Sequence, residues 1–463
     1  MGVEVLSEAG GAQGKGRRRR YAIVGVGDRS RLYRWAMETT YRQHVEIVGY
    51  CDANLGRLQL AQARSEHRTN VRVPIFEPDA FEAMIAQTKP DAVLVMSVDG
   101  THDAYIIGAM ELGCDVICEK PMTTQARKCQ AILDAQRRTG RECRVTFNYR
   151  YSPPRTQVMD LLLGGAIGDV LSADFHWYLN TVHGADYFRR WHSDKANSGG
   201  LLVHKATHHF DLMNWWLRAV PVTVQATGKR EFYTPQMARR LGLQGPHERC
   251  LTCPEKGACA FYFDLSASRS MTNLYLENEA FDGYVRDRCV FRPEINIDDT
   301  MNVIVAYDTG ATLSYSLNAF NAWEGYAVAF NGSGGRLEHR VVEATFTEAG
   351  SDRVGLAEGA VTTRIYPLRG PAREIEPWTG AGDHGGGDLL LLADLFLPER
   401  PADPYARAAD HRAGAWSILT GIAANESIAG GGPIRVTDLV AGLDRPTYPV
   451  SSADGATWRP PRL

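Results

Sequence analysis

The stretch Tyr21-Ala-Ile-Val-Gly-Val-Gly-Asp28 decides the fold of the first part of the chain. A short apolar run leads directly into the turn Gly25-x-Gly27, and a helical stretch rich in arginine and tyrosine follows it. Glycines at such a turn let the backbone approach a pyrophosphate, which the amides at the N-terminus of the next helix can bind. Ser30 occupies the third glycine position, so the fingerprint is incomplete. We expect Gly25, Gly27 and Asp28 to contact a dinucleotide.

The next apolar run, residues 45–51, ends at Asp52. A carboxylate at this point of a dinucleotide-binding fold accepts hydrogen bonds from the adenosine ribose, which favours NAD. Arg57 follows closely enough to bind a 2′-phosphate if its loop turns toward the cofactor. NAD is therefore the expected cofactor, with NADP as the alternative.

Short apolar runs alternate with amphipathic segments from residue 21 to residue 148. This alternation predicts an α/β Rossmann domain, a doubly wound parallel sheet whose ligands bind beyond the carboxyl ends of the strands. The expected strands are 21–26, 45–51, 92–96, 115–118 and 144–148, and the expected helices are 55–65, 78–87, 102–112 and 124–139.

The segment Cys118-Glu119-Lys120-Pro121 lies at one of these strand ends. Pro121 restricts Lys120 to an extended conformation, which would direct the lysine over the cofactor crevice. We expect Glu119, Lys120 and His102, the first residue of an expected helix, to lie at the cofactor.

The pattern changes after Arg150, where long runs with alternating apolar and polar residues dominate. They predict an α+β domain over residues 149–463 with a large open-faced sheet, antiparallel or mixed. An exposed sheet face makes a homo-oligomer, a dimer or tetramer, the expected assembly. The expected strands are 167–180, 222–231, 299–307, 311–318, 325–331 and 336–340, and the expected helices are 200–217, 387–396 and 406–429.

Residues 199–211 read Gly-Gly-Leu-Leu-Val-His-Lys-Ala-Thr-His-His-Phe-Asp. On a helix, His204, His208 and Asp211 share one narrow face, because they are spaced i, i+4 and i+7. Two imidazoles in line predict an active-site wall with His208 as first and His204 as second candidate for the acid and base. We expect Lys205 and Asp211 to contact substrate; a hydrogen bond within the helix is the alternative for Asp211.

A divalent ion between His204 and His208 is a further alternative, although Lys205 stands where a metallopeptidase would carry its glutamate. Outside this stretch, polar side chains at the domain junction and near helix starts are candidate substrate contacts. They are Tyr149, Arg150, Arg190 and His384.

The nine cysteines include a C-x2-C-x5-C cluster in a polar insertion at about residues 232–298. Cys250, Cys253 and Cys259, with Cys289 further on, predict a structural zinc site, since the loop holds little apolar material to fix it. Free thiols or an iron-sulfur cluster are the alternatives.

The chain carries 51 basic and 54 acidic residues, which argues against nucleic acid as a partner despite the run Arg17 to Arg20. Residues 1–20 read as a disordered, solvated tail, and no signal peptide is recognisable. No apolar run reaches the roughly 18 residues of a membrane span. We therefore expect a cytoplasmic protein without a membrane partner.

Four motifs together resemble the Gfo/Idh/MocA family of nicotinamide-dependent oxidoreductases: Gly25-x-Gly27, Glu119-Lys120-Pro121, Asn148-Tyr-Arg150 and residues 199–211. The resemblance implies hydride transfer between NAD(P) and a secondary hydroxyl of a sugar, glycoside or cyclitol. It maps the family's lysine to Lys120 and its histidine to His208. His204 stands where the family usually carries an aspartate, and this difference would remove a fixed negative charge beside Lys120.

Two other functions remain open beside a dehydrogenase. A redox-neutral enzyme would retain NAD while it oxidises its substrate transiently, followed by elimination, hydrolysis or epimerisation. A non-catalytic sensor would bind nucleotide and sugar without turnover, but it would not need Lys120 and His208.

Overall fold

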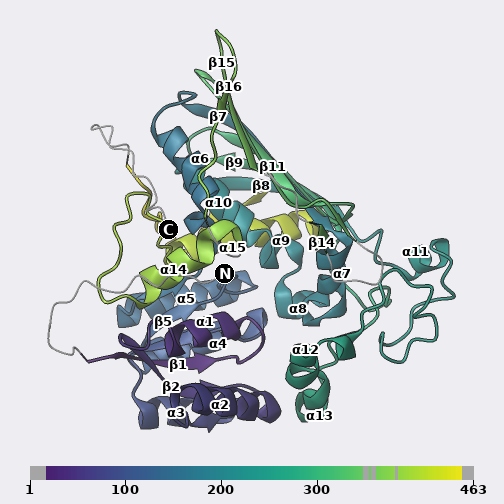
Figure 1. Ribbon diagram of the computed structural model, residues 1–463. Helices are drawn as coiled ribbons and strands as arrows, with labels where there is room; N and C mark the ends of the chain where they lie inside the picture. Colours follow the sequence, from purple (N-terminus) through teal and green to yellow (C-terminus); the bar gives the residue numbers. More distant parts are fainter. Residues whose placement is uncertain (1–16, 348–353, 356–360, 381–383, 451–463) are drawn as a thin grey trace.

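The computed structural model describes residues 17–347, 354–355, 361–380 and 384–450 (Figure 1). The first half of the described chain forms a six-stranded sheet in the order β3-β2-β1-β4-β5-β6. All of its strand pairs are parallel. This topology confirms the predicted doubly wound Rossmann sheet. Its strands are β1 (Arg19–Val24), β2 (Val45–Cys51), β3 (Ile75–Phe76), β4 (Ala92–Val95), β5 (Asp115–Cys118) and β6 (Cys143–Val145).

Helices cover this sheet, and they agree with the expected segments to within a few residues at each end. They are α1 (Ser30–Glu38), α2 (Leu55–Thr69), α3 (Phe81–Thr88), α4 (His102–Glu111) and α5 (Ala126–Thr139). The start of the fold differs from the expected tail, because β1 already includes Arg19 and Arg20. Arg19 pairs with Asp115 at 2.8 Å and Arg20 with Glu46 at 3.1 Å. Carboxylates of β5 and β2 thus hold basic residues that the sequence suggested were solvated.

The second half forms a nine-stranded sheet in the order β16-β15-β12-β11-β7-β10-β9-β8-β17. Only the pair β7–β10 is parallel among these strands, so the sheet is mixed. The strands are β7 (Val170–Asn180), β8 (Pro221–Lys229), β9 (Thr300–Tyr307), β10 (Thr312–Asn321), β11 (Glu324–Gly332), β12 (Gly335–Ala344), β15 (Val361–Pro367), β16 (Arg373–Ile375) and β17 (Ile434–Arg435). A separate pair joins β13 (Phe346–Thr347) and β14 (Val354–Gly355).

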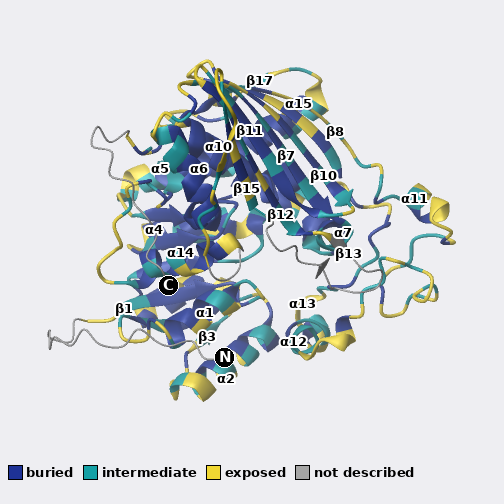
Figure 2. Ribbon diagram, turned by 45° about the horizontal axis from the view of Figure 1, so that its top comes forward, coloured by how far each residue is buried: buried dark blue, intermediate teal, exposed yellow. Residues whose placement is uncertain are grey.

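Helices cover one face of the large sheet and leave the other open (Figure 2). The covering helices include α6 (Pro153–Leu163), α10 (Thr207–Leu217) and α15 (His411–Gly430). Burial alternates along β9 and β10, because successive side chains point to opposite faces. This is the predicted open-faced sheet.

The helix α14 (Gly387–Phe396) packs on the Rossmann half although it belongs to the last part of the chain. The ring of Phe396 lies 5.6 Å from that of Tyr21, 6.5 Å from Tyr33 and 5.7 Å from Tyr41. Such aromatic contacts add to the free energy gained from burial. The core of the Rossmann half is therefore completed by residues near the C-terminus.

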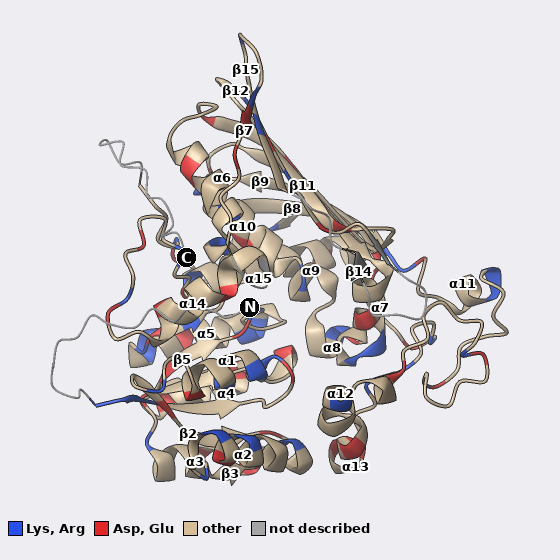
Figure 3. Ribbon diagram, viewed as in Figure 1, with Lys and Arg blue, Asp and Glu red and all other residues tan. Residues whose placement is uncertain are grey.

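The insertion between β8 and β9 contains only short helices, namely α11 (Pro235–Arg240), α12 (Arg269–Leu274) and α13 (Glu279–Asp282). Its segment α12–α13 lies beside α2 of the Rossmann half, as Figures 1 and 3 show. No helix within the described ranges is long and apolar enough to cross a membrane.

Candidate active site

The turn after β1 lies at the carboxyl edge of the parallel sheet. Gly25 has a φ of +88°, and a Cβ there would lie 2.3 Å from the carbonyl oxygen of Met96. Only glycine satisfies both the conformation and the close approach. A Cβ on Gly27 would have the Tyr275 hydroxyl, 4.0 Å away, as its nearest neighbour, so the backbone is accessible here. The predicted pyrophosphate would fit between this turn and the N-terminus of α1.

Two further residues complete this edge. The hydroxyl of Ser30 donates to the carbonyl of Gly27 at 2.7 Å, which holds the turn against α1. Serine thus stabilises the motif at the position where the fingerprint has a glycine. Asp28 pairs with Arg31 at 3.0 Å near the surface.

Asp52 follows β2 in a fixed orientation. One of its oxygens accepts from the backbone N–H of Val26 at 2.8 Å, and the other accepts from that of Asn54 at 2.9 Å. Arg57 also donates to Asp52, at 3.2 Å. The carboxylate therefore sits beside the glycine turn, where a ribose would lie.

His102 and Glu119 are both buried near the carboxyl edge of the parallel sheet. His102 is 1% exposed, and its ring nitrogens lie 2.9 Å from the carbonyl oxygen of Pro121 and 3.1 Å from that of Ser97. It joins the loops that follow β4 and β5. These contacts favour a positioning role for His102, and its predicted cofactor contact stays a prediction.

Glu119 is buried in the same loop region, directly after β5. It accepts from Arg29 Nε at 2.6 Å and from the Tyr33 hydroxyl at 2.7 Å. Burial alone would raise the pKa of Glu119, but the charges of Arg29 and Lys120 lower it below its usual range. This carboxylate holds the loop that carries Lys120, and its predicted cofactor contact stays a prediction.

The centre of the site is a chain of three polar side chains. Lys120 Nζ lies 3.5 Å from His204 Nε2 and 3.3 Å from the His204 carbonyl oxygen, and the Lys120–Pro121 peptide is cis. On the other side of the ring, His204 Nδ1 lies 2.5 Å from Asp99 Oδ2. Asp99 belongs to the loop after β4, so both parts of the molecule contribute to this chain.

Asp99 corrects one expectation from the sequence. The histidine at position 204 does not leave the site without a carboxylate, because Asp99 faces this ring from the Rossmann half. Sequence analysis missed Asp99, which is 105 positions away from His204. Its position directly after a parallel strand was the one available signal, since ligands bind at such ends.

Burial shapes the protonation of all three groups. It lowers the pKa of Lys120 to about 8, partly opposed by the negative charges of Asp99 and Glu119. It lowers the pKa of His204 well below its usual range, an effect that the charge of Lys120 reinforces. Burial also raises the pKa of Asp99 well above its usual range. The amine of Lys120 can therefore gain and lose a proton near neutral pH.

The predicted helix 200–217 is divided at Lys205 and Ala206 into α9 (Leu201–His204) and α10 (Thr207–Leu217). The backbone N–H of Ala206 reaches back five residues, to the carbonyl of Leu201, and so widens this turn. The two imidazoles of the motif consequently stand on separate helices and have different surroundings.

His208 stacks on Tyr149, with ring centroids 4.2 Å apart and an interplanar angle of 13°. The ammonium of Lys205 lies 3.3 Å from the Tyr149 hydroxyl and 4.5 Å from the ring centre of Trp177. Burial lowers the pKa of Lys205. His209, by contrast, is fully buried and lies 2.8 Å from the Tyr315 hydroxyl, which makes it part of the core.

Arg150 and Asp211 form an ion pair within the core. Both side chains are 1% exposed, and two hydrogen bonds of 2.7 and 2.6 Å join them. Such a bidentate pair fixes the geometry of both groups. It attaches the 3-10 turn Asn148–Tyr151 to α10. The prediction that these two residues contact substrate gains no support from this geometry.

Arg190 pairs with Asp186 at 2.7 Å and lies 3.3 Å from His192 Nε2. The ring of His192 is 4.2 Å from that of His204. His192 therefore lies in the same histidine cluster, although the sequence did not predict it as a site residue. His384 begins the 3-10 turn His384–Gly386, but its side chain lies outside the described part of the structure.

The four predicted zinc ligands, Cys250, Cys253, Cys259 and Cys289, line one small cavity in the insertion. Within the described residues, however, no group of three or more His, Cys, Asp or Glu side chains is arranged to hold a metal ion. The Cys250 sulfur instead faces Arg189 at 3.3 Å, and burial raises the pKa of the Cys250 thiol. Neither the zinc site nor the ion between His204 and His208 gains support.

A strand-turn-helix that could cradle a dinucleotide, next to a lysine and a histidine, defines an NAD-binding oxidoreductase of the Rossmann class. Family models agree with this class over most of the chain. Residues 19–147 match an oxidoreductase family with an NAD-binding Rossmann fold, and residues 160–436 match the C-terminal α/β domain of that family. The chain belongs to the Gfo/Idh/MocA oxidoreductases.

Known proteins show the same relationship. YteT of Bacillus subtilis (strain 168), an oxidoreductase by name, is 38% identical over 406 residues, which cover 86% of this chain and 93% of YteT. D-glucoside 3-dehydrogenase of Escherichia coli (strain K12) is 30% identical over 151 residues, covering 33% of this chain and 41% of that enzyme. The WlbA dehydrogenase from Bordetella pertussis, solved with NADH and UDP-GlcNAcA, shares the fold at a TM-score of 0.59, with 18% identity over 90% of this chain and 99% of its own.

Proposed function

We propose that this protein is an NAD-dependent oxidoreductase that transfers a hydride from a secondary hydroxyl of a sugar, glycoside or cyclitol. The observation that carries the proposal is the chain Asp99–His204–Lys120 at the carboxyl edge of the Rossmann sheet. Similarity to D-glucoside 3-dehydrogenase supports the substrate class.

The protein offers groups that complement the phosphates and the ribose of NAD. The accessible backbone at Gly27 and the N-terminus of α1 would hold the pyrophosphate, and Asp52 would accept the ribose hydroxyls. When bound, the nicotinamide supplies the hydride acceptor. The remaining chemistry, which is to hold the substrate oxygen and move its proton, falls to the side chains of this chain.

Lys120 is the residue that we assign to the substrate oxygen. Its amine, with a pKa of about 8, can accept the hydroxyl proton and pass it toward His204 Nε2, 3.5 Å away. Asp99 orients the ring by binding its other nitrogen. The sequence made His208 the first candidate for the base and the family resemblance maps the family's histidine to it; placed on the next helix and stacked on Tyr149, it is here the alternative to His204.

The reaction is tested by following NADH absorbance with a panel of sugars, glycosides and cyclitols, alongside measured NAD binding. A substrate-dependent absorbance rise supports the proposal. Substrate cleavage or epimerisation without net absorbance change would identify the redox-neutral alternative. Tight binding of NAD and sugar without any product would identify a sensor.

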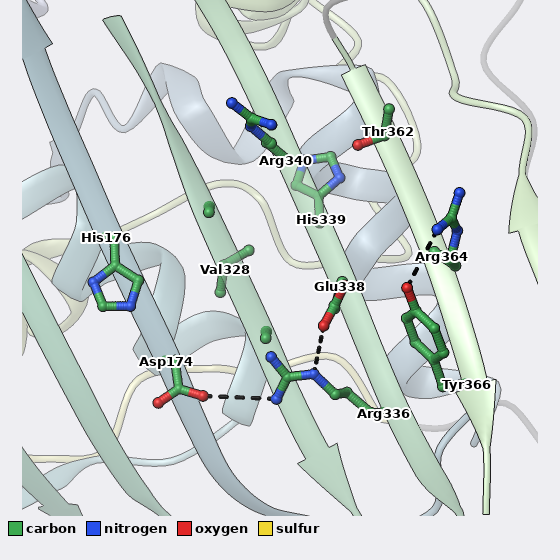
Figure 4. Close-up of a pocket in the computed structure, with 12 residues that line it drawn as sticks. Asp174, His176, Val328, Arg336, Glu338, His339, Arg340, Thr362, Arg364 and Tyr366 are labelled. Atoms are coloured by element: carbon green, nitrogen blue, oxygen red, sulfur yellow. Dashed lines mark hydrogen bonds and ion pairs between the residues drawn. The ribbon is translucent and has the colours of Figure 1, made fainter. Parts of the chain in front are cut away.

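The open face of the large sheet is proposed as the contact with a second copy of the chain. Figure 4 shows that β7, β11, β12 and β15 line a hollow there with side chains of both charges. Arg336 lies 3.7 Å from Asp174 and 2.7 Å from Glu338. A face with both charges can be complementary to itself in a two-fold dimer. Light scattering with size-exclusion chromatography tests this: a monomer would contradict it.

A further inference from the structure

The insertion reaches the adenosine end of the predicted cofactor site. The side-chain amide of Asn54 donates to the carbonyl of Asn278 at 2.8 Å within a buried contact. A Cβ on Gly56 would lie 1.9 Å from Asn278 Oδ1 and 2.7 Å from the ring of Phe281. The glycine at position 56 therefore allows α13 to approach the start of α2 closely.

Arg57 lies between carboxylates from two parts of the molecule. One nitrogen of its guanidinium is 3.2 Å from Asp52 and 2.5 Å from Asp282, the last residue of α13. The three side chains are only 12%, 9% and 17% exposed. Two negative charges thus face one positive charge in a site with little solvent.

A cofactor with a 2′-phosphate would need this same guanidinium. Dinucleotide-binding folds accept NADP through an arginine near the ribose, and they select NAD through a carboxylate at the end of the second strand. Here the arginine is present but is already bound by both carboxylates. A phosphate entering the site would have to displace the Asp282 carboxylate from Arg57. It would then be repelled by the negative charges of Asp52 and Asp282 nearby.

We propose that Asp282 of the insertion is a specificity-determining residue that withholds Arg57 from the 2′-phosphate and so makes the enzyme select NAD over NADP. This inference rests on the proposed use of a nicotinamide cofactor. It gives the insertion a role that neither of the two core domains supplies. It predicts that this chain excludes NADP although it has an arginine in the position suited to that cofactor.

The test is titration of the full-length protein with NADH and with NADPH, followed by cofactor fluorescence. The Asp282→Asn variant keeps the shape of the side chain and its acceptor oxygen but removes the charge that holds Arg57. We expect NADPH to bind this variant about tenfold more tightly, because a hydrogen-bonded charge is released to the phosphate. NADH affinity should change less than threefold.

Two matched variants isolate the mechanism. Glu277→Gln removes a negative charge from the same segment at an exposed residue, and it should leave the ratio of the two affinities unchanged. Adding Arg57→Ala to Asp282→Asn should abolish the gain for NADPH. Asp282→Ser gives the same comparison if the asparagine variant does not fold.

The outcomes separate this inference from the proposed function. If the unmodified protein binds neither cofactor, the proposed function fails and the inference fails with it. If it binds NADH but the ratio is the same in Asp282→Asn, only the inference is overturned. If it prefers NADPH from the start, the inference is overturned and the proposed cofactor becomes NADP, while the proposed hydride transfer stands.

Discussion

Two of the polar contacts between the Rossmann half and the rest of the chain treat charge in opposite ways. At the predicted catalytic centre, burial lowers the pKa of Lys120 to about 8, lowers the pKa of His204 and raises that of Asp99. At the adenosine end, Arg57 keeps its charge because two carboxylates surround it, and its pKa is raised. The first contact is suited to moving a proton and the second to selecting a ligand by its charge.

The sharpest test of this contrast is Lys120→Met, which removes the titrating amine. We expect kcat to fall by about 10³-fold or more, since general acid-base groups contribute up to roughly 10⁴-fold. NADH binding should be largely retained, because Gly25, Gly27 and Asp52 carry the predicted pyrophosphate and ribose contacts. Lys120→Arg is the control: it restores the positive charge but not an amine that titrates near neutral pH, so it should remain inactive. Substantial activity in either variant would remove Lys120 from the mechanism.

The next largest effect separates the two imidazoles. His204→Gln should lower kcat by about 100-fold, because it interrupts the proton path from Lys120 to Asp99. The same change at His208 is the matched variant. Our assignment is reversed, with His208 as the base, if two results are found together. His208→Gln would lower kcat more than His204→Gln does, and it would change the pH profile while His204→Gln leaves that profile unchanged.

Asp99→Asn tests the electrostatic coupling through the pH profile. Oxidation needs the neutral amine, so the rate of the unmodified enzyme should rise with pH through about 8. The charge of Asp99 raises the pKa of Lys120. Removing it should therefore shift this rise to lower pH, with kcat at its plateau reduced about tenfold. A rise that stays in place, or moves to higher pH, would contradict the coupling.

The smallest expected effect is at the adenosine end. Gly56→Ala suits the helix but collides with Asn278, so the insertion should loosen. We expect NADH to dissociate about threefold faster, which corresponds to losing one contact of ordinary strength. Stopped-flow displacement measures this rate, and kcat at saturating cofactor serves as the control. An unchanged dissociation rate would show that the insertion does not limit cofactor exchange.

Much of the architecture could be predicted, because apolar and polar residues repeat at a regular spacing along long strands and helices. The alternation along β9 and β10 and the apolar run before Gly25 were sufficient for the two sheets. Strands as short as Ile75–Phe76 and Ile434–Arg435 were missed, since two residues have no period to recognise.

The site was predictable only where its residues are neighbours in sequence. His204 and His208 could be found together from their spacing, and Lys120 from its place at a strand end. The partner of His204, Asp99, is brought there by the tertiary fold alone. The ion pair between Arg150 and Asp211 could not be predicted, because the sequence shows their charges but not their complete burial.

The position of Phe396 among Tyr21, Tyr33 and Tyr41 has a consequence for biosynthesis. A nascent chain that has just emerged as far as α5 still has a vacant apolar recess on its first sheet. That recess is filled only after more than two hundred further residues have left the ribosome. The N-terminal half should therefore mature late, and a fragment ending near residue 150 should aggregate or need a chaperone.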